Sequence, residues 1–231
     1  MSGMAGDFKF LLWLLLLRNS SSCFGSELDI KCLKTLQQSV VDPRGILKSS
    51  WNFGNSTNGF IFSFTGVVCW FPGENRVYSL RLSNLGLEGQ FPQGLEHCTS
   101  MFVLDLSSNN FSGPIPSDIA QQLPYVTDLE LSYNKFSGEI PVGISSLTSL
   151  SILNLQHNRL TGQIPGQLSE FNQLTKFNVA DNQLSGPIPY ALQEFPPSNF
   201  AGNQGLCGAP LDYCPSKTKW RLKRARLHND Q

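Results

Sequence analysis

The sequence predicts an α/β solenoid of five stacked repeats of about 24 residues, closed by an N-terminal and a C-terminal cap. Three observations indicate this fold: a fragment of the form LxLxxNxLxGxIP recurs along the chain, its copies are evenly spaced, and cysteine-containing segments flank the series. The equivalent positions Leu85, Asn109, Asn134, Asn158 and Asn182 lie 24, 25, 24 and 24 residues apart. Units of this size bury a shared core only by stacking on their neighbours.

Each repeat contributes one short strand followed by an inward turn. The alternating apolar residues of LxL, as in Leu104-Asp105-Leu106, place one strand face inward, and the stacked strands form a short parallel sheet on the concave side. The asparagine after each strand can pair with buried backbone groups that lack a ladder partner. We therefore expect an internal ladder of asparagines, which a leucine interrupts in the first repeat. Its members are Asn109, Asn134, Asn158 and Asn182.

This pattern divides the chain into five segments. They are a signal peptide (1–25), an N-terminal cap (26–76), five repeats (77–194), a disulfide-bonded C-terminal cap (195–214) and a basic disordered tail (215–231). In the N-terminal cap we expect a short helix that ends at the turn 42–45 (Asp-Pro-Arg-Gly), together with Trp51 and the apolar segment 64–70. The caps cover the apolar ends that a stack of repeats leaves open.

The N-terminus has the pattern of an export signal. Lys9 precedes an apolar run of eight residues, 10–17, which spans about 12 Å as a helix, far less than the roughly 30 Å of a bilayer core. We expect cleavage near Gly25 or Ser26 and a secreted protein. A buried core helix is the alternative for this run. No other segment has 18 consecutive apolar residues, so we expect no membrane span in the mature chain.

The charge distribution argues against a nucleic-acid-binding body. The chain has 17 basic and 17 acidic residues, but six of the cations lie between residues 217 and 226. Residues 26–214 keep nine basic and fifteen acidic residues, a net charge of −6. Phosphate binding needs a basic surface. A hydrophobic content of 40% suffices for a packed core and excludes wholesale disorder.

Secretion makes the cysteines candidates for disulfide bonds. With Cys23 in the signal peptide, five cysteines remain, so at least one stays unpaired or pairs between chains. The expected states are a Cys207–Cys214 bridge, Cys32 and Cys69 as the next candidate pair, and Cys98 as a buried free thiol. No CxxC or HxxxH spacing supports a zinc site.

A search for catalytic motifs finds none of the GxSxG, GxxxxGK[ST], HExxH or Rossmann type. Asp128 and Glu130 project from one strand face, as a glycosidase pair does, but an open sheet offers no water-excluding pocket. We therefore expect no enzyme activity, no catalytic residue, no metal and no cofactor.

Binding is the function that the strand pattern favours. Residues between and after the inward leucines point to the concave face, where acidic side chains gather in the second and third repeats beside aromatic and apolar ones. The candidate protein-binding residues are Arg81, Val103, Asp105, Asp128, Glu130, Tyr133, Ile152, Asn154, Gln156, His157, Lys176, Asn178 and Asp181. Exposed aromatics among polar groups are typical of protein interfaces, although any single position can be an ordinary solvated one.

Two further features concern the surface. The sequons Asn55-Ser-Thr57 and Asn110-Phe-Ser112 are candidate glycosylation sites, which requires both asparagines to face solvent. The tail 215–231 is basic, and its Trp220 and Leu227 lie seven residues apart, as on one face of a helix. It is either a surface-binding segment for anionic membranes or a disordered end, and we favour the disordered end.

Several motifs resemble the ectodomains of plant leucine-rich-repeat receptor-like kinases. They are Trp51, Gly-Val-x-Cys at 66–69, the LxGxIP repeats and Gly-Leu-Cys-Gly-x-Pro-Leu-x-x-Cys at 205–214. The small number of repeats, with Cys32-Leu-Lys, Cys69-Trp70, Glu74-Asn75-Arg76-Val77 and Leu-Asp-Tyr-Cys at 211–214, is most similar to the BIR class of inactive receptor kinases. The resemblance covers residues 27–214. It implies a leucine-rich-repeat solenoid that associates with co-receptor kinase ectodomains and restrains immune or growth signalling.

The chain departs from that family at two points. Phe62 stands where family members usually carry a cysteine, so we expect Cys69 to pair with Cys32 or to stay free. The membrane helix and kinase-like domain of the family do not follow residue 214. The implied partner is a receptor-kinase ectodomain, with no nucleic acid and with membrane contact only through that partner or the basic tail. Two alternatives stay open: an inhibitor of cell-wall-degrading enzymes of the polygalacturonase-inhibitor type, and a fragment of a membrane receptor-like kinase.

Overall fold

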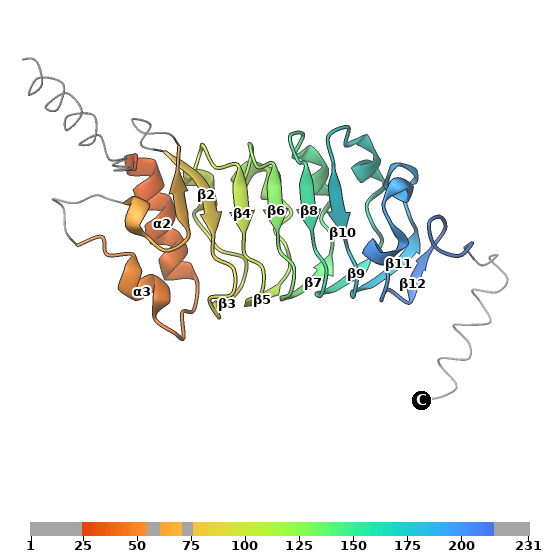
Figure 1. Ribbon diagram of the computed structural model, residues 1–231, viewed down its shortest axis with the longest axis horizontal. Helices are drawn as coiled ribbons and strands as arrows, with labels where there is room; N and C mark the ends of the chain where they lie inside the picture. The colour runs from red at the N-terminus through yellow and green to blue at the C-terminus, as the bar shows by residue number, and fades with distance from the viewer. Residues whose placement is uncertain (1–24, 55–60, 71–75, 215–231) are drawn as a thin grey trace, which may run out of the picture.

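The structure, a computed structural model, describes residues 25–54, 61–70 and 76–214, the side chain of Phe62 excepted. In these residues the chain forms a solenoid with a helical cap at its N-terminal end (Figure 1). The cap contains the helices α2 (Glu27–Ser39) and α3 (Ile46–Ser50) and the short turn η1 (Ile61–Ser63). The expected signal peptide, Cys23, the sequon at Asn55 and the basic tail 215–231 lie outside the described residues.

One sheet runs along the concave side of the stack and confirms the predicted fold class. Its strands, in spatial order, are β1 (Val67–Cys69), β2 (Val77–Arg81), β4 (Val103–Asp105), β6 (Asp128–Glu130), β8 (Ile152–Asn154) and β10 (Lys176–Asn178). The strands from β2 onward are parallel, whereas β1 of the cap pairs antiparallel with β2. Each inward leucine pairs with its equivalent one repeat further on, as Leu104 does with Leu129, so the register follows the sequence repeat.

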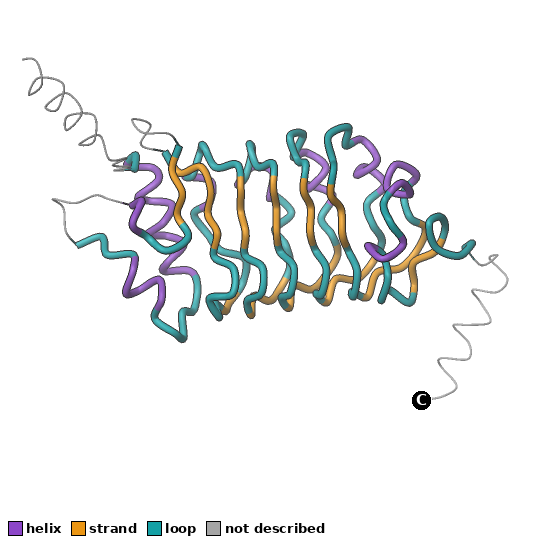
Figure 2. Tube along the Cα trace, viewed as in Figure 1, coloured by secondary structure: helices purple, strands orange, loops and turns teal. Residues whose placement is uncertain are grey.

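A second parallel sheet follows the first around the solenoid, and the repeat pattern did not predict it. Its strands are β3 (Glu88–Gly89), β5 (Asn110–Gly113), β7 (Lys135–Glu139), β9 (Arg159–Gly162), β11 (Gln183–Pro187) and β12 (Gly205–Cys207). Figure 2 shows these strands along the lower edge of the stack, separate from the upright concave strands. Gly113 and its equivalents in the next three repeats all have φ between 76° and 89°, a region that side chains disfavour.

Short helical turns return the chain to the next concave strand. They are η2 (Leu95–His97), α4 (Ile119–Gln122), η3 (Val142–Ser146), η4 (Gly166–Glu170) and η5 (Tyr190–Glu194), with η6 (Pro197–Asn199) leading into the C-terminal cap. One apolar side chain of each main turn, such as Ile144 in η3, is fully buried or nearly so. Burying one such side chain contributes about 1.5–3 kcal/mol, so regular stacking rather than helix length stabilises these turns.

The core is a set of columns that run along the stack. Phe111 and Phe136, which occupy equivalent positions in neighbouring repeats, are completely buried and their rings stack at 6.1 Å. Leu160 and Leu184 continue this column in the next two repeats. Each repeat therefore buries its apolar face mainly against its neighbours, as a solenoid requires.

The asparagines form an internal ladder at the turn between the two sheets. The Asn158 amide nitrogen donates to the carbonyls of Leu131 (3.0 Å) and Leu155 (3.1 Å), and its oxygen accepts from the N–H of Phe136 (2.9 Å). One side chain thus joins two repeats. The other members repeat this pattern: Asn109, Asn134 and Asn182.

The ladder extends into the C-terminal cap, which the sequence analysis missed. Asn203 accepts from the N–H of Leu184 (3.0 Å) and donates to the carbonyls of Val179 (2.9 Å) and Phe200 (3.0 Å). The segment Phe200-Ala-Gly-Asn203 has the same spacing as Leu106-Ser-Ser-Asn109, so the signal was present in the sequence.

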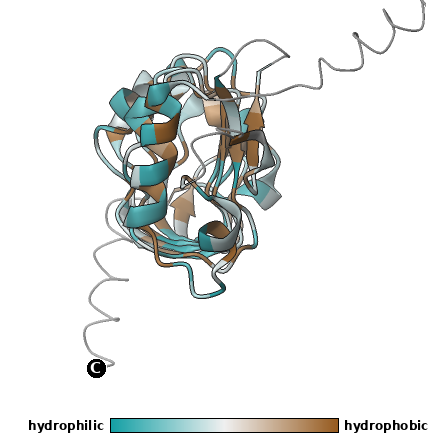
Figure 3. Ribbon diagram, turned by 90° about the vertical axis from the view of Figure 1, so that its left-hand side faces the viewer, coloured by the Kyte–Doolittle hydropathy of each residue, from teal (hydrophilic) through white to brown (hydrophobic). Residues whose placement is uncertain are grey.

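The N-terminal cap is built on α2. Its first turn carries a capping box, in which the Asp29 N–H donates to the Ser26 hydroxyl (3.1 Å) and the Ser26 N–H donates to the Asp29 carboxylate (3.2 Å). Leu33 and Leu36 are fully buried on its inner side. Figure 3, a view onto the N-terminal end, shows α2 in front of the repeats that it covers.

The turn 42–45 acts differently from our expectation. Helix α2 ends at Ser39, before this turn. The Asp42 carboxylate accepts hydrogen bonds from the N–H groups of Ile46 (3.0 Å) and Leu47 (2.8 Å) and so caps the start of α3.

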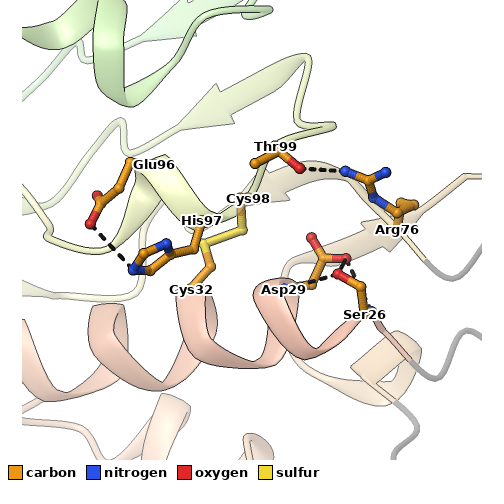
Figure 4. The surroundings of a disulfide bond; sticks show 8 residues. All are labelled: Ser26, Asp29, Cys32, Arg76, Glu96, His97, Cys98 and Thr99. Atoms are coloured by element: carbon orange, nitrogen blue, oxygen red, sulfur yellow. Dashed lines mark hydrogen bonds and ion pairs between the residues drawn. A yellow bond between two sulfur atoms is a disulfide. The ribbon is translucent and has the colours of Figure 1, made fainter.

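The disulfide bonds correct the expected pairing. Cys32 of α2 is bonded to Cys98, so the expected Cys32–Cys69 pair and the free Cys98 thiol were wrong (Figure 4). The reason is that α2 packs against η2, which Cys98 directly follows, whereas Cys69 lies on β1 beside Val77. Cys69 is itself disulfide-bonded, and no cysteine in the described residues is free.

A further bridge joins Cys207 to Cys214 and closes a loop in the C-terminal cap. The Cys32–Cys98 bridge is longer in range and ties the cap helix to the first repeat. Beside it, the Arg76 guanidinium donates to the Thr99 hydroxyl (Figure 4).

We expect the two described bridges to contribute unequally to stability. The sequence separation is 66 residues for Cys32–Cys98 and 7 for Cys207–Cys214. Loop-closure entropy then gives losses of about 4 and about 2 kcal/mol in the free energy of unfolding for the double variants C32A/C98A and C207A/C214A. Denaturant unfolding of both variants measures the difference. Equal losses would contradict the role of Cys32–Cys98 as the link between cap and repeats.

Candidate protein-binding face

The concave sheet displays side chains in two rows that cross the repeats. The strand register defines a first row of Ser79, Val103, Asp128, Ile152 and Lys176 and a second row of Arg81, Asp105, Glu130, Asn154 and Asn178. Because successive strand residues alternate between faces, both rows project away from the leucine core.

Most of these predicted positions are open to a partner. Arg81 and Lys176 are exposed, and the acidic and amide members of the second row are half-buried. Val103 is only 4% exposed, which corrects its assignment as a contact residue. It is not part of the main hydrophobic core, and its strand partners in the first row are Ser79 and Asp128. At the N-terminal end of the first row, Ser79 is also inaccessible to a partner, because it is only 1% exposed.

A third row lies at the turn after each strand and has an unusual backbone. Its members are Asn84, Ser108, Tyr133, His157 and Asp181, which have φ between 51° and 56°. Each directly precedes a ladder position, and the same conformation recurs with five different side chains, so the turn imposes it. A left-handed conformation costs a non-glycine residue about 1–2 kcal/mol. Tyr133 and His157 are therefore kept on the surface in a conformation that glycine would adopt more easily.

Three members of this row contact one another. The Tyr133 and His157 rings stack with centroids 4.3 Å apart, and His157 Nε2 lies 3.1 Å from Asp181 Oδ2. Tyr133 remains 49% exposed. A ring that is already held in place loses less conformational freedom when a partner binds, which favours an interface role.

The second row carries a perturbed carboxylate. Burial raises the pKa of Glu130 above its ordinary value of 4.5, and the nearby charges of Asp105 and Asp128 raise it further. A hydrogen bond with Asn154 and the charge of Lys176 act in the opposite direction. Glu130 also lines a shallow pocket that extends toward Phe195 and Asn199 at the C-terminal end of the face.

Amide side chains order the same end of the face. Asn178 Nδ2 donates to Gln156 Oε1 (2.7 Å), and Asn199 Nδ2 donates to the Phe177 carbonyl (2.8 Å). Asn199 was not among the predicted residues, because it comes from the C-terminal cap rather than from a strand.

An aromatic cluster at the N-terminal cap was also missed. The Trp70 ring lies 4.7 Å from Tyr78 and 5.3 Å from Phe102, and its Nε1 donates to the Ser100 carbonyl (3.2 Å). All three rings are half-buried at the start of the concave strands. Tyr78 and Phe102 each lie two residues before the first leucine of their LxL motif, so the repeat alignment contained this signal.

The described residues offer neither a metal-binding cluster nor a membrane-spanning helix. No group of three or more His, Cys, Asp or Glu side chains in these segments is placed to hold a metal ion. None of the helices in the same segments has the length and apolar character needed to cross a membrane.

The stacked strands, the asparagine ladder and the open concave face define a leucine-rich-repeat recognition solenoid. The Leucine Rich Repeat family matches residues 100–122, 125–147, 149–171 and 173–195. The structure is similar to the crystal structure of the BIR2 ectodomain from Arabidopsis thaliana, with a TM-score of 0.78 and 46% identity over 80% of this chain and 98% of that chain. The chain therefore belongs to the leucine-rich-repeat receptor-kinase family, as an ectodomain of the BIR type.

Two further relatives support the same placement. A chain in the crystal structure of the BIR3–SERK2 complex from Arabidopsis thaliana gives a TM-score of 0.77 at 45% identity, over 81% of this chain and 100% of that chain. An Arabidopsis thaliana protein named "Probably inactive leucine-rich repeat receptor-like protein kinase" is 53% identical over 226 residues, 95% of this chain and 36% of the relative. This chain thus spans about a third of that relative's length.

The raised pKa of Glu130 predicts a pH-dependent stability effect. Its ionised form is disfavoured in the folded state, so the penalty develops as pH rises above 4.5 and is complete above the raised pKa. The variant E130Q should unfold about 1–2 °C higher than the parent at pH 7, and this gain should vanish below pH 4.5.

Thermal unfolding across this pH range measures the effect. The matched control is E139Q, on the exposed end of β7, which should not move the midpoint. A gain from E130Q that stays constant with pH would show that titration of Glu130 is not its cause.

Proposed function

We propose that this protein is a non-catalytic extracellular recognition module that binds the ectodomain of a receptor-like kinase and thereby modulates plant immune or growth signalling. The observation that carries the proposal is the concave face, where the Tyr133 and His157 rings stack and His157 contacts Asp181. The second row of the same face adds the carboxylates of Asp105 and Glu130. This face combines an aromatic anchor with polar and charged neighbours, the composition that concentrates binding energy in protein interfaces.

The class of partner is supported by the BIR-type relatives. One of the two similar crystal structures is that of a BIR3–SERK2 complex, so an ectodomain of this size and shape takes part in a pairwise assembly. For this chain we infer a partner of the same class, a co-receptor kinase ectodomain. Binding would act by occupying the partner's surface, which requires no catalytic group.

An extracellular location fits the chemistry of the described residues. The bridges Cys32–Cys98 and Cys207–Cys214 form readily in an oxidising compartment and are rare in the cytosol. The apolar run 10–17, interpreted as an export signal, supplies the route to the apoplast.

The double variant Y133A/D128K should weaken capture of the partner ectodomain about 30-fold or more. It removes the exposed ring and reverses one charge of the first row, and hot-spot truncations of this kind cost about 2 kcal/mol or more. The Tyr133 side chain is half-exposed, so thermal stability should change little. The measurement is surface-immobilised binding of the secreted chain to a panel of co-receptor kinase ectodomains.

The matched control is Y190A, because Tyr190 is 86% exposed but lies on η5, away from the concave sheet. Y190A should bind as the parent does. Unchanged binding by Y133A/D128K would move the interface off the concave face. Inhibition of a pectinase by the parent chain, with no capture of any kinase ectodomain, would replace the proposal by the enzyme-inhibitor alternative.

A further inference from the structure

The second sheet carries a tripeptide of the N-glycosylation type. The sequence contains three such tripeptides, beginning at Asn19, Asn55 and Asn110, and the third lies within the described residues, on β5. Asn110 and Ser112 are both reachable from solvent, whereas Phe111 between them is completely buried in the core. The strand therefore holds Asn110 and the hydroxyl two residues later on the same outer face.

The Asn110 carboxamide makes no hydrogen bond to the described residues. Its backbone N–H donates to the Leu87 carbonyl (2.7 Å), but no described residue provides a hydrogen-bond partner for its side chain. The preceding Asn109 carboxamide makes five hydrogen bonds in the ladder. Two adjacent asparagines thus have opposite roles, one internal and one facing outward.

The other repeats show that this position faces solvent throughout the stack. The residues equivalent to Asn110 are Lys135, Arg159 and Gln183, and all three are exposed. Each begins its strand in the second sheet, which Figure 1 shows along a different side of the solenoid from the concave strands. A group attached to Asn110 would therefore extend from the solvent-facing side of the second sheet.

We propose that Asn110 carries an N-linked glycan that covers the N-terminal part of the second sheet and leaves the concave sheet to the protein partner. This rests on the secretory route of the proposed function. A lipid-linked oligosaccharide diphosphate supplies the sugar: a bond forms between the sugar C1 and Asn110 Nδ2, and the bond from C1 to the diphosphate oxygen breaks. The lipid diphosphate leaves with the electron pair of that bond, and the one proton lost by Nδ2 balances its added charge. Ser112 supplies the hydroxyl that defines the acceptor tripeptide.

Glycopeptide mapping tests the modification. The full chain is expressed in plant cells, collected from the medium and treated with peptide N-glycosidase in heavy-oxygen water, which converts each released asparagine to a mass-labelled aspartate. We expect the label at residue 110 in the parent chain and in S112T, and its loss in S112A. An unlabelled, unmodified Asn110 in the parent chain collected from the medium would overturn the proposal.

A glycan scan tests which face the sugar protects. The variants K135N, R159N and Q183N each complete an acceptor tripeptide with a hydroxyl already present at Ser137, Thr161 or Ser185. If the second sheet is a glycan-bearing side that the partner does not use, each added glycan should leave binding to the captured kinase ectodomain within about twofold of the parent. A tenfold or larger loss in any glycosylated variant would contradict this division of faces.

Different results would overturn the proposed function and the glycan at Asn110. A parent chain that binds no kinase ectodomain overturns the proposed function, while the mass label at residue 110 still decides whether the site is modified. An unmodified Asn110 with intact binding overturns only the glycan.

Discussion

The structure depends on one interaction, the hydrogen bonding of buried asparagine amides to backbone groups of adjacent repeats. At the turn between the two sheets the backbone leaves the concave strands, and its N–H and C=O groups are buried without strand partners. Each ladder asparagine satisfies one carbonyl of its own repeat and one carbonyl and one N–H of the preceding repeat, as Asn158 does for Leu155, Leu131 and Phe136. An unsatisfied buried group of this kind costs about 1–3 kcal/mol, so the ladder fixes the stacking distance and the register.

The same constraint shapes the surface that we assign to binding. Because the turn directs the ladder position inward, the residue before it adopts positive φ in each of the five repeats, including the first, where Leu85 takes the place of the asparagine. Tyr133, His157 and Asp181 therefore come together from three repeats without any contact between distant parts of the sequence. The same turn in each repeat thus places one outward side chain per repeat in a row. The residue type at this position differs between repeats.

Much of this was predictable from the sequence, and the failures have physical reasons. The 24-residue period is set by local geometry, so it predicted the concave sheet, the ladder and the outward positions. The second sheet was missed because its strands are irregular stretches that become strands only when repeats stack. The sequence analysis assigned Cys98 as a free thiol. Its bond to Cys32 depends on how α2 packs on the first repeat, and the repeat period does not predict that packing. The burial of Val103 likewise depends on neighbours in three dimensions.

The most direct measurement is backbone hydrogen exchange, followed amide by amide. The N–H groups of Phe111, Phe136, Leu160 and Leu184 donate to the side-chain oxygens of four successive ladder asparagines. If the ladder holds the stack together, these four amides should exchange only through global unfolding, as slowly as the amides of the central concave strands. Exchange of these amides at the rate of exposed turns, with the concave strands still protected, would contradict the account.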